Sequence, residues 1–367
     1  MTRVALVHER LTEIGGSERV VEQFAAIWPQ ARLFVPVADP QIRLDGLAGT
    51  AVSTSWLKHL YRGGGRYAHL LPLLPSAMAT ARFPGAELVI VSHHAFANRV
   101  RPPSGVPLIS YTHSPARWIW DASMRAGEAG RIGSLGLAGF AATQRAADRR
   151  AAQRPQVIVA NSTAVAERVH RWWGREAVVI PPPVDVDFYR PDHGIPREDF
   201  FLLAGRLVPY KQPEIAVAAA TRAGLRLVVA GEGRSRRATQ NLAGPNVEFL
   251  GRVTDSKLRD LYRRCRALIF PGVEDFGIIP VEAQACGTPV IALDAGGAQD
   301  TVLPGLSGVL VPQSDHQVDE FAKALRSFDE SEFDPASILD HAEQFSRDHF
   351  RARMRELAEE VICGRRQ

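Results

Sequence analysis

Short apolar runs alternate with amphipathic segments along the chain, and this alternation is the feature that most restricts its fold. Runs such as Val4–Val7 and Leu88–Val91 are short and rich in Val, Ile and Leu, as strands buried on both faces are. Segments such as Arg19–Trp28 lie between the runs and have the pattern of helices packed on a sheet. The alternation therefore predicts an α/β fold built of parallel sheets with crossover helices.

A proline-rich boundary divides this alternation into two halves. Pro181, Pro182 and Pro183 precede a stretch of charges, prolines and glycine that interrupts regular structure. A chain of 367 residues is long enough for two domains. We expect doubly wound Rossmann-like domains at residues 1–182 and 183–345, facing one another across a cleft. Residues 346–367 are expected to form a C-terminal helical segment that could cross back to the first domain.

Charge is distributed unevenly between the halves. Residues 1–180 contain 21 Lys and Arg against 12 Asp and Glu, whereas residues 181–367 contain 23 against 28. No nucleic-acid-binding motif accompanies the basic half, so we expect no nucleic acid partner. An anionic membrane surface or an anionic acceptor is favoured, and a solvated Arg-rich surface is the alternative. The segment from Trp56 to Arg66 mixes apolar and basic residues and could rest on a membrane or pack as an ordinary helix.

Sequence features also predict the location of the protein. No apolar run approaches the roughly 20 residues that cross a bilayer, and the N-terminus lacks a signal-peptide core. We expect a cytoplasmic protein, with a peripheral position on the inner face of the membrane left open. Three widely spaced cysteines indicate neither a disulfide framework nor a zinc site.

The loops after the predicted strands of the second half contain candidate ligand-binding residues. Ligands of open parallel sheets bind at the carboxyl ends of the strands. Arg206 and Lys211 follow the strand ending at Ala204 and flank the start of a helix that Pro213 opens. Two cations beside unpaired helix amides can neutralise a diphosphate, although two surface cations near a helix start would look the same.

The most informative segment begins after the predicted strand Ala267–Phe270. Glu274 lies in the loop, Phe276, Gly277 and Ile278 open a helix, and Glu282 lies within it. Helix-opening amides can contact phosphate and sugar hydroxyls, and a carboxylate can accept two hydroxyl hydrogen bonds at once. Two glutamates alone would indicate little, but their position within this order of strand, Glu-Asp-Phe-Gly, helix and Gly-Thr-Pro is informative.

Residues 204–297 resemble the donor-binding domain of retaining glycosyltransferases of family 4, which have the GT-B fold. The resemblance rests on Glu274 and Glu282 with seven residues between them, and on Arg206 and Lys211 at the diphosphate-binding positions. It implies that Glu274 binds the donor sugar, Glu282 the ribose, and the backbone of Phe276–Ile278 the sugar and phosphates. The nucleobase is then expected at Arg252 and Val253.

The first half resembles the same family more loosely. Gly15 and Gly16 follow the first predicted strand and are similar to a glycine pair whose backbone faces the phosphates and acceptor, although a simple glycine turn is the alternative. The stretch Ser110–Asp121 is similar to one found in mannosyltransferases acting on lipid-linked saccharides. By that resemblance His113 would face the transferred sugar, the alternative being a packed histidine. His93 and His94 are interpreted as structural or acceptor-lining.

The resemblance implies transfer with retention of anomeric configuration, without a metal or other cofactor. Asp185 and Asp187 imitate a metal-binding Asp-x-Asp element but lie in the proline-rich boundary, so we expect no metal ligands there. The predicted catalytic residues are thus His113, Arg206, Lys211 and Glu274.

The expected partners are a nucleoside diphosphate sugar, favoured as GDP-mannose, and a glycan or lipid-linked acceptor. A UDP-sugar-dependent enzyme and a non-catalytic nucleotide-sugar-binding protein are the main alternatives; an epimerase or phosphorylase of related fold would be separated by its products. A nicotinamide dehydrogenase is disfavoured because the first turn lacks Gly-x-Gly-x-x-Gly.

Overall fold

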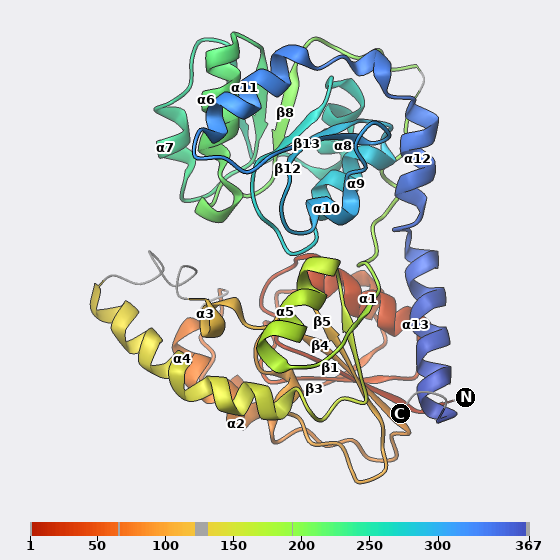
Figure 1. Ribbon diagram of the computed structural model, residues 1–367. Helices are drawn as coiled ribbons and strands as arrows, with labels where there is room; N and C mark the ends of the chain where they lie inside the picture. The colour runs from red at the N-terminus through yellow and green to blue at the C-terminus, as the bar shows by residue number, and fades with distance from the viewer. Residues whose placement is uncertain (1, 65–66, 122–130, 193, 365–367) are drawn as a thin grey trace. The chain divides into compact units, whose positions relative to one another are not determined.

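The computed structural model describes residues 2–64, 67–121, 131–192 and 194–364. They form two compact units, one of residues 1–183 with 350–367 and one of residues 184–349 (Figure 1). All strand pairs of both sheets are parallel within the described residues. The predicted α/β class, with two doubly wound Rossmann-like units, is therefore confirmed.

The first unit contains a seven-stranded sheet in the order β3-β2-β1-β4-β5-β6-β7 among the described residues. The strands are β1 Val4–His8, β2 Arg32–Val35, β3 Ala51–Thr54, β4 Leu88–His93, β5 Leu108–Thr112, β6 Val157–Ala160 and β7 Val178–Val179. The α-helices are α1 Gly16–Ile27, α2 Leu74–Met78, α3 Arg117–Trp120, α4 Arg131–Ala151, α5 Thr163–Trp173 and α13 Arg347–Ile362. Short 3-10 helices are η1 Asp45–Leu47, η2 Trp56–His59, η3 Ala68–Leu73 and η4 Ala97–Arg99.

Two hydrophobic clusters cover the two faces of this sheet. Within β1, Leu6 belongs to the cluster that includes α1 and α13, whereas Ala5 and Val7 belong to the other. Side chains of a strand alternate between its faces, which is why a run buried on both sides is apolar at every position. Phe350 of α13 packs against Phe24 of α1 at a ring distance of 5.6 Å, so the last helix contributes to the core of the first unit.

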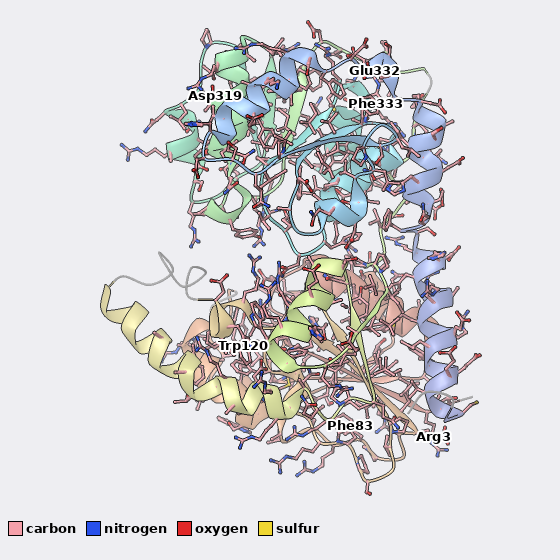
Figure 2. All side chains as sticks on the ribbon, viewed as in Figure 1. Arg3, Phe83, Trp120, Asp319, Glu332 and Phe333 are labelled. Carbon is pink, nitrogen blue, oxygen red and sulfur yellow. The ribbon has the colours of Figure 1, made fainter. Side chains whose placement is uncertain are left out.

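A buried carboxylate organises the outer helices of the first unit. Asp148 of α4 accepts hydrogen bonds from the indole nitrogens of Trp120 at 2.7 Å and Trp173 at 2.8 Å; Trp120 is labelled in Figure 2. Burial raises the pKa of Asp148, although both indoles favour its charged form. The carboxylate thereby joins α3, α4 and α5.

The second unit contains a six-stranded sheet in the order β10-β9-β8-β11-β12-β13 among the described residues. The strands are β8 Phe201–Ala204, β9 Leu227–Ala230, β10 Val247–Gly251, β11 Leu268–Phe270, β12 Val290–Leu293 and β13 Gly308–Val311. The helices are η6 Pro209–Lys211, α6 Pro213–Ala223, α7 Arg236–Gln240, α8 Asp255–Arg264, α9 Ile278–Ala285, α10 Ala298–Thr301, α11 Gln317–Ser327, η7 Glu330–Glu332 and α12 Pro335–Glu343.

The sheet of the second unit also has a cluster on each face, one containing Leu202 and the other Phe201 and Leu203. Helices α6 and α11 pack against each other over the second of these faces (Figure 1). Both strand orders reverse beside the first strand of the unit, at β1/β4 and at β8/β11. Such topological switch points are where open α/β sheets bind ligands.

Three strands were not predicted from the sequence. β3 is an edge strand whose first three residues are exposed, β2 begins with an exposed arginine, and β7 has only two residues. None is a strand of four or more residues that are all apolar, unlike the short apolar runs on which the prediction depended. Segment Trp56–Arg66 was considered as a packed helix, but only Trp56–His59 forms a 3-10 helix, and Arg66 lies outside the described residues.

Candidate active site

The loops after β8 and β11 meet through an ion pair. Lys211 Nζ lies 2.7 Å from Glu274 Oε1, and the two side chains are only 15% and 19% exposed. A pair shielded from solvent in this way is screened less by salt than a surface pair. The structure therefore brings together two predicted site residues that are 63 positions apart in the chain.

Arg206 lies on the same loop as Lys211, but its side chain has a different contact. It is exposed, and its guanidinium donates to the Tyr210 hydroxyl at 3.2 Å. The Lys211 ammonium lies 3.5 Å from the place that a Cβ on Gly205 would occupy, immediately before Arg206. The loop thus presents one shielded and one exposed cation.

Helix α9 begins beside the Lys211–Glu274 pair. Gly277 is its N-cap, with a φ of 91° that favours glycine, and Ile278 is its first residue. Phe276 is buried in the core, and the Glu274 carbonyl accepts a hydrogen bond from the Gly297 amide at 3.0 Å. The loop after β12 is thereby hydrogen-bonded to the loop that contains Glu274. This bond and the buried Phe276 side chain stabilise the start of α9.

Glu282 lies on α9 and accepts a hydrogen bond from the Tyr262 hydroxyl at 3.1 Å. Burial raises the pKa of Glu282 to about 7, while the Tyr262 hydrogen bond and the Lys211 charge oppose the shift. Near neutral pH this carboxyl is therefore a mixture of its acid and its base, so it can donate as well as accept a hydrogen bond.

The two predicted nucleobase residues follow β10. Arg252 is exposed, and Val253 packs against the core cluster that contains α9. The glycine-rich turn Gly231–Gly233 directly follows β9. A Cβ on Gly231 would stand 1.8 Å from the Gly205 carbonyl, so the close approach there is to the protein's own backbone.

In the first unit, His113 follows β5 and lies in a buried hydrogen-bonded network. Its Nε2 is 2.8 Å from Ser92 Oγ, which is 3.0 Å from His8 Nδ1. His8 Nε2 is 3.1 Å from Glu18 Oε1, and the Gly15 amide donates to the other oxygen of Glu18 at 3.0 Å. Gly15 is thus the N-cap of α1 and its amide is already bonded, while Gly16 is the first residue of the helix.

The remaining histidines of this region differ in their surroundings. His93 is fully buried, and its Nδ1 accepts the Asn98 amide at 3.3 Å, which is a structural contact. His94 is half-buried, and its ring stacks on that of His113 with ring centres 4.6 Å apart. Burial lowers the pKa of His113 well below its ordinary value and that of His94 to about 3, and neighbouring positive charge adds to both shifts. Both rings are therefore neutral near pH 7.

Four residues of this region had no role predicted from the sequence: Glu9, His8, Glu18 and Ser92. The Glu9 carboxylate accepts the backbone amides of residues 94–97 at 2.7–3.5 Å and so shapes the loop after β4. A signal was present, since a polar residue ends or follows each of the apolar runs of β1 and β4. Their joint position became evident only once β1 and β4 were paired, with His8 opposite Ser92.

The first aspartate of the Asp-x-Asp element bonds to other residues of its own unit. Asp185 pairs with Arg347 at 2.7 Å and accepts the Phe188 amide at 3.3 Å. Among the described residues, no group of three or more His, Cys, Asp or Glu side chains is placed to hold a metal ion. None of the described helices combines the length and the apolar character needed to cross a membrane.

A cavity of about 910 Å³ opens at the other end of the first sheet. Arg3 and Phe83, labelled in Figure 2, line it together with the first residues of β1, β2 and β3. These are the amino ends of parallel strands, whereas ligands of such sheets bind at the carboxyl ends. We therefore do not assign the cavity to the candidate active site.

Comparison with known proteins shows which protein families and which fold this chain resembles. Residues 185–347 match the family model "Glycosyl transferases group 1", and residues 14–188 match "Glycosyltransferase Family 4". The sucrose-phosphate synthase of Thermosynechococcus elongatus has a similar structure, with a TM-score of 0.74 and 19% identity over 99% of this chain and 100% of that one. Anabaena HepE in complex with UDP has a TM-score of 0.67 and 18% identity over 98% and 100%. The fold is GT-B.

Relatives with similar sequences include proteins named as glycosyltransferases. A protein named D-inositol 3-phosphate glycosyltransferase 1 from Catenulispora acidiphila is 32% identical over 70% of this chain and 66% of its own length. A D-inositol 3-phosphate glycosyltransferase of Rhodococcus opacus is 29% identical over 72% and 66%. The chain thus spans just under two thirds of the length of these relatives. Two glycosyltransferase family models thus match separate halves of the chain, which has the GT-B fold.

Glu282 gives this site a testable pH dependence. A carboxyl whose pKa is higher in the folded protein binds protons more tightly there than in the unfolded chain. From about pH 4.5 to about pH 7, the two pKa values, Glu282 therefore makes the folded state less stable as pH rises, and its effect is constant above that range. We expect Glu282→Gln to lack this contribution.

The measurement is the free energy of unfolding of both proteins in denaturant at several pH values. The wild-type value should fall by about 1–3 kcal/mol relative to the variant across this window. Glu332→Gln, at an exposed carboxylate of the same unit labelled in Figure 2, is the control and should follow the wild-type profile. Parallel profiles for wild type and Glu282→Gln would contradict the raised pKa.

Proposed function

We propose that the chain transfers a hexose from a nucleoside diphosphate sugar to a hydroxyl of an acceptor, with retention of anomeric configuration. The observation that carries this proposal is the shielded Lys211–Glu274 pair beside the start of α9. It combines a cation for a diphosphate, a carboxylate for sugar hydroxyls, and unpaired helix amides within one loop cluster. The matches to two glycosyltransferase family models support the same proposal.

Donor binding would redistribute the charges of the pair. Lys211 is paired with Glu274, whereas a bound diphosphate would bring negative charge to Lys211, Arg206 and the amides of Gly277 and Ile278. Glu274 would then accept hydrogen bonds from hydroxyls of the hexose. Glu282 would bind the ribose, and Arg252 and Val253 would lie against the base.

The proposed reaction breaks the bond between the anomeric carbon and the phosphate oxygen, and forms the bond to the acceptor oxygen on the same face of the sugar. The acceptor proton passes to the departing phosphate oxygen, so that atoms and charges balance. The protein's task is to stabilise the charge that develops on the diphosphate and to hold the reactants. His113 would contact a hydroxyl of the transferred sugar.

The favoured donor is GDP-mannose, because the segments around Glu274, Glu282 and His113 resemble those of GDP-mannose users. A UDP-sugar is the main alternative, and UDP is bound in the similar structure of HepE. For the acceptor, we propose a glycan or lipid-linked saccharide. The names of the sequence relatives add D-inositol 3-phosphate as a candidate, and the excess of positive charge in the first half of the chain suits such an anionic acceptor.

Because Arg206 and Lys211 are proposed to act on the diphosphate, removing either charge should lower enzyme activity by more than any accompanying loss of protein stability explains. We expect Arg206→Ala and Lys211→Ala to lower kcat/KM about 100- to 1,000-fold, because each removes a charge that stabilises the leaving diphosphate. Arg206 is exposed, so its substitution should leave the melting temperature nearly unchanged. Lys323→Ala, at an exposed lysine of α11, is the matched control and should retain full activity. Wild-type transfer by both folded site variants would contradict the proposal.

Donor choice can be tested by binding. A ligand that binds only the folded state raises the melting temperature with its concentration. We expect GDP and GDP-mannose to raise it more than UDP, ADP or their sugars, and calorimetry to show weaker GDP binding by Lys211→Ala. Preference for a uridine nucleotide would refute the GDP-mannose proposal. Nucleotide-sugar binding with neither transfer nor hydrolysis, in the presence of candidate acceptors, would favour the non-catalytic alternative.

We also propose that the surface around η2 contacts an anionic membrane. Trp56 and Leu60 are 43% and 47% exposed, and the exposed Lys58 and Arg62 lie in the same segment. Leu57 is fully buried and would hold this surface on the unit. Exposed apolar side chains beside cations suit the interface of anionic lipids.

Vesicle sedimentation tests the membrane proposal. We expect the protein to sediment with vesicles containing phosphatidylglycerol more than with pure phosphatidylcholine, and Trp56→Ser combined with Leu60→Ser to reduce this binding. Leu242→Ser, at an exposed leucine of the second unit, is the control. Sedimentation that is indifferent to anionic lipid would contradict the proposal.

A further inference from the structure

Four side chains of the first unit form one continuous buried chain of hydrogen bonds. Glu18 lies in α1, His8 in β1 and Ser92 in β4, and His113 directly follows β5. The successive contacts measure 3.1 Å, 3.0 Å and 2.8 Å. All four residues are at most 7% exposed. A polar chain this deeply buried is costly unless every member is satisfied, so its arrangement is fixed closely.

The protons of this chain can be assigned from its Glu18 end. Burial alone would raise the pKa of Glu18, but its hydrogen bond and charge interaction with His8 lower that pKa to about 2. Glu18 is therefore an acceptor at neutral pH, and it also accepts from the Gly15 amide and the Ser17 hydroxyl. The His8 Nε2 facing it must consequently carry a proton.

The state of the other His8 nitrogen then decides the direction of the remaining hydrogen bonds. With a single ring proton, His8 accepts at Nδ1 from the Ser92 hydroxyl, and Ser92 Oγ in turn accepts from His113 Nε2–H. His113 Nδ1 is then unprotonated and can accept a hydrogen bond. With a second proton at His8 Nδ1, the Ser92 hydroxyl must donate to His113 Nε2, and the His113 proton lies on Nδ1.

His113 itself remains neutral in both arrangements. Burial lowers its pKa well below the ordinary value, and the charges of nearby histidines add to this effect. Titratable and charged neighbours among the described residues include Glu9 and Arg10 after β1, His93 in β4, Tyr111 in β5 and the stacked His94, whose pKa is about 3. The position of the His113 proton, rather than its charge, is therefore the variable.

We propose that Glu18 and His8 act through Ser92 as positioning residues that determine which ring nitrogen of His113 carries its proton. The inference deepens the proposed function and rests on it only for the contact of His113 with the transferred sugar. An unprotonated Nδ1 accepts a hydrogen bond from a sugar hydroxyl, whereas a protonated Nδ1 donates one. The chain of hydrogen bonds from Glu18 to Ser92 thus determines whether His113 Nδ1 accepts a hydrogen bond from a sugar hydroxyl or donates one.

The pairing of β4 with β1 and β5 explains how Ser92 can bond to both histidines. β4 lies between β1 and β5, with Ser92 opposite His8 on one side and Tyr111 on the other. A hydroxyl at this place can reach both histidines, and the side chain of Ser92 does so. Capping of α1 requires only the contact between Glu18 and Gly15, so it does not account for the two histidines and the serine.

The test is ¹⁵N NMR of the histidine rings in the full chain without ligands, with His113 assigned by its loss in His113→Gln. At a pH where His8 carries one ring proton, we expect wild-type His113 to be a single Nε2–H tautomer. Ser92→Ala and Glu18→Gln should each give a mixture of tautomers. The first variant interrupts the chain of hydrogen bonds, and the second replaces the carboxylate that accepts at its end. Glu22→Gln, at another buried carboxylate of α1, is the control and should keep the wild-type tautomer. An unchanged tautomer in folded Ser92→Ala would overturn the inference.

Kinetics separate this inference from the proposed function. Ser92→Ala should lower kcat about 10- to 100-fold with little change in the donor KM, and Ser92→Thr, which keeps the hydroxyl, should recover part of the loss. Transfer by the wild type together with unchanged kcat in Ser92→Ala would refute the positioning role alone. The predicted tautomers without transfer from any donor would refute the proposed function alone.

Discussion

Parallel strand pairing is the constraint on which the rest of this structure depends. Parallel strands end at the same edge of a sheet, so the loops that follow them are neighbours even when they are far apart in the chain. Lys211 and Glu274 meet because β8 and β11 pair, and His8 meets Ser92 because β1 and β4 pair. Each meeting lies at the point where the strand order reverses.

Two carboxyls of the molecule show how surroundings decide the chemistry of one functional group. Burial tends to raise the pKa of both Glu18 and Glu282. Glu18 has a histidine, an amide and a hydroxyl as donors, and its pKa falls to about 2. Glu282 has one tyrosine hydroxyl and a more distant lysine, and its pKa stays at about 7. The first is therefore a fixed acceptor, and the second can exchange a proton near neutral pH.

Much of the fold and part of the site followed from local sequence patterns. The strands β1, β4 and β11 and the start of α9 lay where apolar runs, glycine and proline predicted them. Edge strand β3 escaped prediction because its exposed residues form no apolar run. Glu18 and Ser92 escaped because each is an ordinary polar residue in its own segment, and only contacts across 10 and 84 positions, respectively, join them to His8.

The sequence by itself determined the α/β class, the two-unit organisation and the candidate donor-binding residues, because these depend on apolar periodicity and on short motifs. Only the tertiary structure decided that Lys211 pairs with Glu274 while the Arg206 guanidinium contacts Tyr210, and that His113 belongs to a hydrogen-bonded chain ending at Glu18. The reason is physical: hydrogen-bond geometry and burial depend on which strands are neighbours, and a single sequence does not record strand order.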